Sequence, residues 1–164
     1  FLIAYATVKE LAPSLDLSKE CQVSLPKGRS ARINFGKLTV LDETYNSSPE
    51  AVLAALNLLS FQKGRHFAVL GKMLELGSHS VSMHRMVAER AAKLHLEGLI
   101  IVASAEEAQV MRDAAIGIPH VEVVTTPELA AVPLNRWLRP KDVVLIKGSR
   151  AIGMEKLLPL LPVF

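Results

Sequence analysis

The feature that most constrains the fold is a regular alternation of short apolar runs with longer segments of helical periodicity. Each run ends at polar residues or glycine, and in the segment that follows it apolar residues recur every three or four positions. Five such runs occur, which predicts an α/β fold with a Rossmann-like, mostly parallel sheet and helices on both faces. The runs are 38–41, 67–70, 98–102, 121–124 and 142–147.

A hairpin is expected at the first of these strands. Residues 31–35 alternate between apolar and polar side chains, and the turn 36–37 joins them to the run at 38–41, so one antiparallel edge strand should be added to the sheet. The first covering helix should begin at Pro49, with Ser48 as its N-cap. The other helices are expected over 80–96, 106–114 and 127–138, and after residue 150 to an end near residue 158.

The first 26 residues follow a different pattern. Apolar residues at helical spacing predict a helix over 1–12, which Pro13 ends, and 14–26 should form a second short helix or an irregular connector. The turn signal Pro26-Lys-Gly28 then marks a domain boundary. Because the first residue is not Met, we expect a fragment or a processed chain.

Composition excludes several classes of protein. Of the 164 residues 50% are apolar and 21% are charged, which is typical of a globular domain and not of a disordered chain. The net charge is only +3, with cations scattered among acidic residues, so nucleic-acid binding is not indicated. Cys21 is the single cysteine, and no secretory signal or membrane span is predicted. We therefore expect a cytoplasmic location.

The stretch 41–49 is the first candidate for a functional loop, because a buried-strand pattern ends there in acidic and amide side chains. Open α/β sheets bind ligands at the carboxyl ends of their strands, so Asp42, Glu43 and Asn46 are candidates to contact a ligand. The alternative is that these side chains only cap and solvate a turn, as such residue types commonly do.

Two more loops should reach the same edge of the sheet, together with 103–104. The loop 71–77 is bracketed by glycines and is longer than a strand-to-helix turn needs. The sequence Lys147-Gly-Ser-Arg150 places two cations, a hydroxyl and backbone N–H groups at a helix start, which is an arrangement that holds anions. The alternative is that both cations are simply solvated.

Other catalytic arrangements are not indicated. Neither G-x-x-x-x-G-K-[ST] nor G-x-G-x-x-G occurs, so the chain has no phosphate-binding loop of these types. His79 and His84 lack a carboxylate at ligand spacing, which favours a capping or surface role over a metal site. Ser149 lies in no nucleophile-elbow pattern, so a hydrolase triad is not expected.

Three stretches, taken in order, carry a family resemblance. They are Leu41-Asp-Glu-Thr-Tyr-Asn-Ser-Ser-Pro49, then Val69-Leu-Gly-Lys-Met-Leu-Glu-Leu-Gly77 followed by His84, and Val144-Leu-Ile-Lys-Gly-Ser-Arg150 with Gly153-Met-Glu155. They resemble the carboxy-terminal part of the Mur ligases, in particular the members that add D-alanyl-D-alanine. The likeness implies that 1–26 are the end of the family's central ATPase domain and a linker, and that 27–164 are the carboxy-terminal domain.

The resemblance implies a ligase that uses ATP and Mg²⁺ to convert UDP-N-acetylmuramoyl-tripeptide into an acyl phosphate, which the amine of D-alanyl-D-alanine attacks. The carboxy-terminal domain would close over its own upstream domains, complete the nucleotide pocket and present the dipeptide. Such a protein is expected to be a monomer without nucleic-acid or membrane partners, and this domain is expected to be inactive alone. Two alternatives stay open: a related Mur or folylpolyglutamate-type ligase with another acceptor, and a non-catalytic α/β binding domain.

Five residues are implied to contact the nucleotide. Arg29 matches the family's linker arginine, which reaches ATP. Asp42 with its neighbour Glu43 matches the acidic position that contacts the nucleotide. Tyr45 and Asn46 match the Tyr-Asn pair of the same motif. The nucleotide and its Mg²⁺ would otherwise be held mainly by the central domain.

Three further residues are implied to lie beside the dipeptide. Lys147, Ser149 and Arg150 supply cations and a hydroxyl that suit its carboxylate. The chain also departs from the family pattern at two places. It has Ser-Ser at 47–48 where Ala-Asn is more common, and Lys72 where the family more often has Asp, which reverses a charge on the functional edge.

Overall fold

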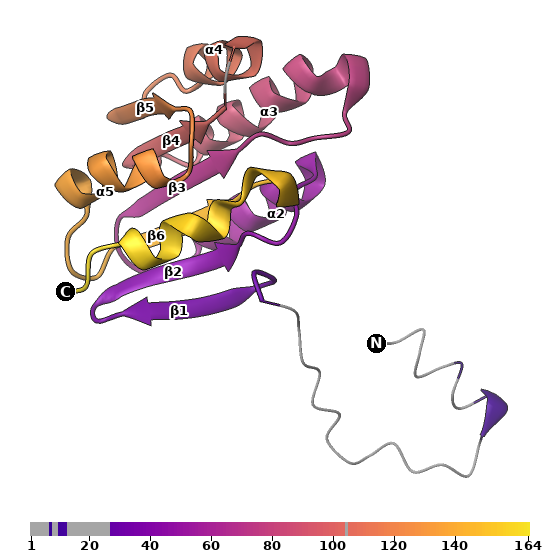
Figure 1. Cartoon of the computed structure of the whole chain (residues 1–164), viewed down its shortest axis with the longest axis horizontal. Helices are drawn as coiled ribbons and strands as arrows, with labels where there is room; N and C mark the ends of the chain where they lie inside the picture. Colours follow the sequence, from indigo (N-terminus) through magenta and orange to yellow (C-terminus); the bar gives the residue numbers. More distant parts are fainter. Residues whose placement is uncertain (1–6, 8–9, 13–26, 104) are drawn as a thin grey trace.

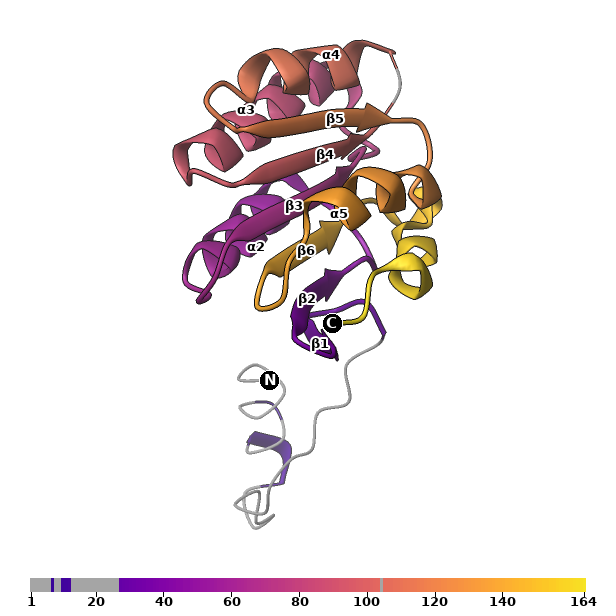
Figure 2. The same ribbon diagram turned by 90° about the vertical axis from the view of Figure 1, so that its left-hand side faces the viewer.

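The centre of the computed structural model, which describes residues 7, 10–12, 27–103 and 105–164, is one sheet of six strands. Its order is β1-β2-β6-β3-β4-β5, and Figure 2 shows the strands in this sequence from bottom to top. β1 runs antiparallel to β2 at one edge, and the other described pairs are parallel, so the predicted sheet is confirmed. The strands are β1 (Ala31–Phe35), β2 (Leu38–Glu43), β3 (His66–Gly71), β4 (Gly98–Val102), β5 (His120–Val124) and β6 (Val143–Lys147).

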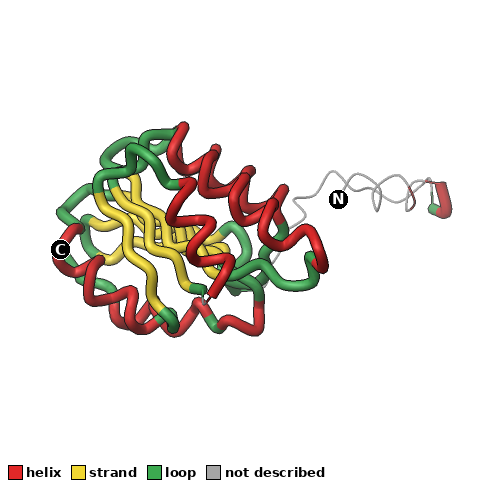
Figure 3. Tube along the Cα trace, turned by 90° about the horizontal axis from the view of Figure 1, so that it is seen from above, coloured by secondary structure: helices red, strands yellow, loops and turns green. Residues whose placement is uncertain are grey.

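Helices cover both faces of this sheet, as predicted (Figures 1 and 3). One face carries α2 (Pro49–Ser60), α3 (Ser80–Lys93) and α4 (Ala105–Ala114). The opposite face carries α5 (Ala131–Trp137) with the 3₁₀ segments η2 (Glu128–Ala130), η3 (Arg150–Ile152) and η4 (Met154–Leu160). A further 3₁₀ segment, η1 (Gly77–His79), directly precedes α3.

β6 shows why the sheet needs two cores. Val143 and Leu145 pack with the helices α2, α3 and α4, whereas Val144 and Ile146 pack with α5 and η4. Successive side chains of a strand point to opposite faces, so a strand covered on both sides must be apolar throughout. All five residues of β6 are buried, which places the strand in the middle of the molecule.

The start of α2 confirms the sequence analysis at the functional edge. The hydroxyl of Ser48 accepts a hydrogen bond from the backbone N–H of Ala51 at 3.3 Å, and Pro49 is the first helical residue. The apolar face of α2 then turns inward, with Val52 and Leu56 at 2% and 0% exposure. This capping and burial together set the direction in which the chain leaves β2.

Two predicted helices are shorter than expected. The helix predicted over 80–96 ends at Lys93, because His95 adopts a φ of 53° that an α-helix cannot contain. The helix predicted over 127–138 splits into η2 and α5. Pro133 has no N–H to donate to the carbonyl of Leu129, so a regular α-helix begins only at Ala131.

The predicted last helix is wrong as an α-helix. It is replaced by η3 and η4, which are separated by Gly153 at a φ of 71°, and Pro159 interrupts α-helical bonding further on. The helices or connector predicted over 1–26 lie outside the described residues, except that Thr7, Glu10 and Leu11 are helical. No helix among the described residues is long and apolar enough to cross a membrane.

Two glycines bring neighbouring strands close together where they end at the functional edge. Gly71 ends β3 and Gly148 follows β6, and a Cβ on Gly148 would lie 3.1 Å from the Cα of Gly71. The same Cβ would lie 2.6 Å from Cγ of Met154, which is fully buried beneath both. Only a residue without a side chain fits this approach.

We predict that Gly148→Ala destabilises the chain by about 1–3 kcal/mol, because the added methyl group overpacks this site. Urea denaturation of the two proteins measures the difference. The double variant Gly148→Ala/Met154→Ala removes the side-chain part of the clash, so its cost should be smaller than the sum of the two single costs. Full additivity would contradict the close packing.

Candidate functional site

Two adjoining pockets occupy the edge of the sheet at which the parallel strands end. The first has a volume of about 350 Å³ and the second of about 620 Å³. The segment 45–48 lines both, so it forms a shared wall between them. We call them the linker pocket, whose other walls include Gly28, Arg29, Glu43 and Lys147, and the loop pocket, whose other walls include 74–76 and 149–151.

Tyr45 is the centre of this arrangement, because an arginine from each pocket lies over its ring. The guanidinium carbon of Arg29 is 4.1 Å from the ring centroid, and that of Arg150 is 5.6 Å away. Both distances are within the range of a cation–π interaction. The backbone N–H of Tyr45 also donates to the carbonyl of Gly28 at 2.9 Å, which fixes the chain before β1 against the shared wall.

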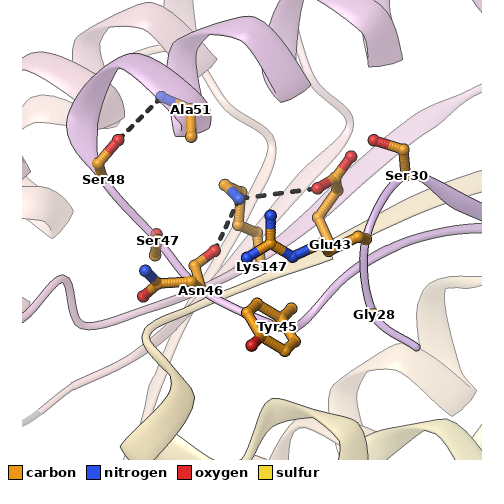
Figure 4. Close-up of a pocket in the computed structure, with 10 residues that line it drawn as sticks. Gly28, Ser30, Glu43, Tyr45, Asn46, Ser47, Ser48, Ala51 and Lys147 are labelled. Carbon is orange, nitrogen blue, oxygen red and sulfur yellow. Dashed lines mark hydrogen bonds and ion pairs between the residues drawn. The ribbon is translucent and has the colours of Figure 1, made fainter. Parts of the chain in front are cut away.

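Lys147 is the buried cation of the linker pocket (Figure 4). Its Nζ donates to the carbonyl oxygen of Asn46 at 2.9 Å and lies 3.8 Å from a carboxylate oxygen of Glu43. Burial lowers the pKa of Lys147, the carboxylate of Glu43 opposes that shift, and Arg29 adds to it. Two cations and one carboxylate therefore face this pocket, an excess of positive charge that suits an anionic ligand.

Asp42 is placed differently from the prediction that it contacts a ligand together with Glu43. Asp42 is 4% exposed and lines neither pocket. Its Oδ1 accepts hydrogen bonds from the hydroxyl of Thr44 at 2.7 Å and from the backbone N–H of Thr44 at 3.1 Å. Asp42 thus shapes the turn, as the alternative interpretation held, and Glu43 is the carboxylate that reaches the pocket.

Lys147 also departs from the predicted grouping with Ser149 and Arg150. The in-register pairing of Lys147 with Glu43 directs Lys147 into the linker pocket, whereas Ser149 and Arg150 line the loop pocket. Gly148 lies between them and turns the chain. Arg29, Glu43, Tyr45 and Asn46 do come together at the linker pocket, and their roles toward a ligand remain predictions.

Ser149 holds the loop 71–77 in place. Its hydroxyl accepts a hydrogen bond from the backbone N–H of Leu74 at 2.9 Å, and its own N–H donates to the carbonyl of Lys72 at 3.2 Å. Ser149 is only 4% exposed. The hydroxyl predicted to bind a substrate is therefore engaged in positioning a loop that lines the pocket.

His84 holds the same loop from the other side. Its Nε2 accepts a hydrogen bond from the backbone N–H of Met73 at 2.9 Å, while Nδ1 lies 2.7 Å from the carbonyl of Ser80. This geometry requires a neutral imidazole with its proton on Nδ1, since Nε2 is the acceptor. Burial lowers the pKa of His84, which favours the same neutral form.

Lys72, the residue with the reversed charge, forms an ion pair. Its Nζ lies 2.7 Å from Oε1 of Glu107 in the first turn of α4, and the same oxygen accepts a hydrogen bond from Ser80. The hydrogen bond from Lys72 is the largest cause of the lowered pKa of Glu107. Lys72 thereby ties the loop 71–77 to α4, a structural role that the sequence alone did not reveal.

The residues that sequence reasoning missed lie mainly in this loop. Leu74, Glu75 and Leu76 line the loop pocket, and the signal that pointed to them was the unusual length of the glycine-bracketed connection. Ser47 was also missed; it lines both pockets, and its buried hydroxyl has no hydrogen-bond partner in the described chain. No sequence pattern marks a hydroxyl as unpartnered.

The donor set of this edge fits anions better than metals. Among residues 27–103 and 105–164, no group of three His, Cys, Asp or Glu side chains is placed to hold a metal ion. The linker pocket instead offers a guanidinium and an ammonium beside the amino end of α2.

Comparison with known proteins matches this architecture to one family. Residues 28–150 match the family described as Mur ligase, glutamate ligase domain. The chain belongs to the Mur ligase family. The resemblance seen in the three sequence stretches is thereby confirmed, and the matched range contains the lining residues of both pockets except Ala151.

Individual relatives agree with this assignment. The Mur ligase chain is 37% identical over 134 residues to the UDP-N-acetylmuramoyl-tripeptide--D-alanyl-D-alanine ligase of Synechocystis sp., covering 80% of the chain and 29% of that protein. Its structure matches the MurF ligase from Thermotoga maritima in complex with ADP, with 29% identity and a TM-score of 0.79, covering 96% of this chain and 35% of that one. MurF from Acinetobacter baumannii matches at 26% identity and a TM-score of 0.80, covering 94% and 35%. The chain therefore spans about a third of the length of these relatives.

We predict that His84 makes the stability of this Mur ligase chain depend on pH. The pKa of His84 is lowered in the folded state from its usual 6.5, so the unfolded chain binds the proton first as the pH falls. The contribution of His84 to the free energy of unfolding should therefore be greatest above pH 6.5 and should decrease as the pH falls below 6.5. Denaturant titrations at about pH 7.5 and about pH 5.5 measure this difference.

The variant His84→Gln cannot titrate and should show a smaller difference between the two pH values. His79→Gln changes an exposed histidine five positions away and serves as the matched control, with the wild-type difference expected. An undiminished pH dependence in His84→Gln would show that the buried imidazole is not its source.

Proposed function

We propose that this chain is the carboxy-terminal domain of an ATP-dependent ligase that joins D-alanyl-D-alanine to UDP-N-acetylmuramoyl-tripeptide in peptidoglycan synthesis. The observation that carries the proposal is the pair of pockets that share the wall 45–48, with one arginine from each lying over Tyr45. A ligase that joins an activated acid to an amine must bring a nucleotide and an acceptor together. Two adjoining pockets with separate charged groups suit that task.

In the proposed reaction, ATP converts the tripeptide carboxyl group into an acyl phosphate. The dipeptide amine then attacks the acyl carbon, so that a C–N bond forms, the bond from carbon to the phosphate oxygen breaks, and the nitrogen loses a proton. The first step, phosphoryl transfer from ATP to the carboxyl group, depends on positioning and charge stabilisation more than on covalent groups of the protein. The role assigned to this chain is therefore to bind and orient the nucleotide and the dipeptide.

The linker pocket is assigned to the nucleotide. Arg29 and Lys147 supply positive charge, and Glu43 and Asn46 supply acceptors for hydroxyl or amino groups. A structural relative was crystallised with ADP, which supports nucleotide use by the family. Because the described residues contain no metal-ligand cluster, the Mg²⁺ that accompanies ATP would be held by the upstream domains.

The loop pocket is assigned to D-alanyl-D-alanine. Arg150 offers a planar guanidinium that can hold a carboxylate with two parallel hydrogen bonds, and Leu74 and Leu76 offer apolar surface. Within the described chain Arg150 forms no ion pair, and in particular none with Glu155, so its charge is available to a ligand. The alternative given in the sequence analysis is that this cation is simply solvated.

The remaining parts of the proposal follow from the assigned reaction. Residues 1–26 would be the end of the central ATPase domain and a linker, and 27–164 the domain that closes over it. The proposed substrate is a soluble nucleotide-linked precursor, so the proposed location is the cytoplasm. The proposed state, a monomer, is what the family resemblance implies. A related ligase with another acceptor would keep the linker pocket and differ in the loop pocket, since specificity is decided by loops.

We predict that two matched substitutions separate the two pockets in a ligase that contains this chain with its upstream domains. Arg150→Lys keeps the charge but loses the paired donors, and it should lower kcat/KM for the dipeptide about tenfold or more. Arg29→Lys should instead raise KM for ATP. Steady-state rates against each substrate measure both effects. Wild-type kinetics for the dipeptide in Arg150→Lys would contradict the assignment of the loop pocket.

The 164-residue chain alone should have neither ATPase nor ligase activity, because it has no phosphate-binding loop and its described residues hold no metal-ligand cluster. Phosphate release and amide formation can be assayed with purified chain, ATP, Mg²⁺ and both substrates. The same assay with the complete ligase is the positive control. Turnover by the isolated chain would refute the proposal that catalysis requires the upstream domains.

A further inference from the structure

The loop pocket contains a second charge that no assignment above uses. Ten residues line this pocket, and of these Glu75 and Arg150 are the two that carry full charges of opposite sign. Glu75 is exposed, and within the described part of the chain it takes part in no ion pair or side-chain hydrogen bond. A carboxylate and a guanidinium thus face one cavity without neutralising each other.

The backbone at Glu75 is held in an uncommon conformation. Its φ is 64°, in the left-handed region where glycine or asparagine is usual and a glutamate is rare. Neighbouring hydrogen bonds enforce this conformation: the N–H groups of Met73 and Leu74 donate to His84 and Ser149, and the carbonyl of Leu76 accepts from His79. The fold therefore presents this one carboxylate at the pocket against the preference of the residue type.

The chemistry of the pocket matches a short zwitterion. A dipeptide carries an ammonium at one end and a carboxylate at the other, and in extended form it spans at most about 7 Å. The cavity of about 620 Å³ accommodates such a molecule. Leu74 and Leu76 flank Glu75 and offer apolar surface to the methyl groups of the dipeptide. A ligand with opposite charges at its two ends favours a site with one carboxylate and one cationic side chain.

We propose that Glu75 binds the ammonium end of D-alanyl-D-alanine while Arg150 binds its carboxylate. This proposal rests on the proposed function and adds the residue that orients the dipeptide nitrogen, which attacks as the neutral amine after the bound ammonium has lost one proton to solvent. A carboxylate that accepts N–H hydrogen bonds holds the nitrogen in one place relative to the acyl carbon. The loop 71–77 thereby selects for an unblocked amine at the correct distance from the carboxylate.

Binding to the 164-residue chain tests the proposal without any requirement for turnover. Two probes are used: D-alanyl-D-alanine, and D-lactyl-D-alanine, in which a hydroxyl replaces the ammonium at similar size. NMR titrations give the dissociation constants for the wild-type chain, Glu75→Gln and Arg150→Lys. Glu97→Gln is the matched control, because Glu97 precedes β4 and lies at the opposite end of the sheet.

We expect Glu75→Gln to bind D-alanyl-D-alanine about tenfold more weakly than the wild-type chain does. The wild-type chain should also bind D-lactyl-D-alanine about tenfold more weakly, and Glu75→Gln should distinguish little between the two probes. Glu97→Gln should behave as wild type. Spectra of the free variants show that each one keeps the wild-type fold.

The inference could be overturned in two ways, which differ in whether the proposed function is retained. Wild-type affinity in Glu75→Gln together with weakened binding in Arg150→Lys would remove Glu75 from the site and keep the proposed function. Absence of dipeptide binding to the wild-type chain, or unchanged binding in Arg150→Lys, would overturn the assignment of the loop pocket and with it the role of Glu75.

Discussion

The parallel pairing of β6 between β2 and β3 is the constraint on which the rest of the structure depends. It joins strands that are about 75 to 100 residues apart in the chain, and it places Lys147 in register with Glu43 on one side and Leu70 on the other. Because all these strands point the same way, the segments that follow them emerge together. Without this pairing the two pockets would have no common wall.

Close packing at this edge converts the pairing into a defined site. Gly71 and Gly148 allow the ends of β3 and β6 to approach, with Met154 filling the space beneath them. Ser149 then bonds to the loop 71–77, and His84 bonds to the same loop from α3. Several of the polar groups that sequence analysis assigned to ligands or left unassigned are thus occupied in holding the walls of the pockets.

The charges that remain available are few and are divided between the pockets. Arg29, Lys147 and Glu43 belong to one, Glu75 and Arg150 to the other, and both arginines lie over the ring of Tyr45. Under the proposed function, this separation would let one domain bind a polyanionic nucleotide and a small zwitterion at the same edge. It also explains why Lys72, despite its location, need not meet a ligand, since Glu107 neutralises it at 2.7 Å.

The sequence by itself determined the strands, the antiparallel edge, the N-cap at Ser48 and the family, because these depend on local periodicity, turn chemistry and short motifs. It also indicated which loops line the two pockets. Only the tertiary structure decided where the side chains of those loops lie. Asp42 faces Thr44, Lys147 is separated from Arg150, and Glu75 faces the loop pocket. These outcomes depend on the register between strands distant in the chain and on hydrogen bonds between loops, and neither leaves a pattern within a single segment of sequence.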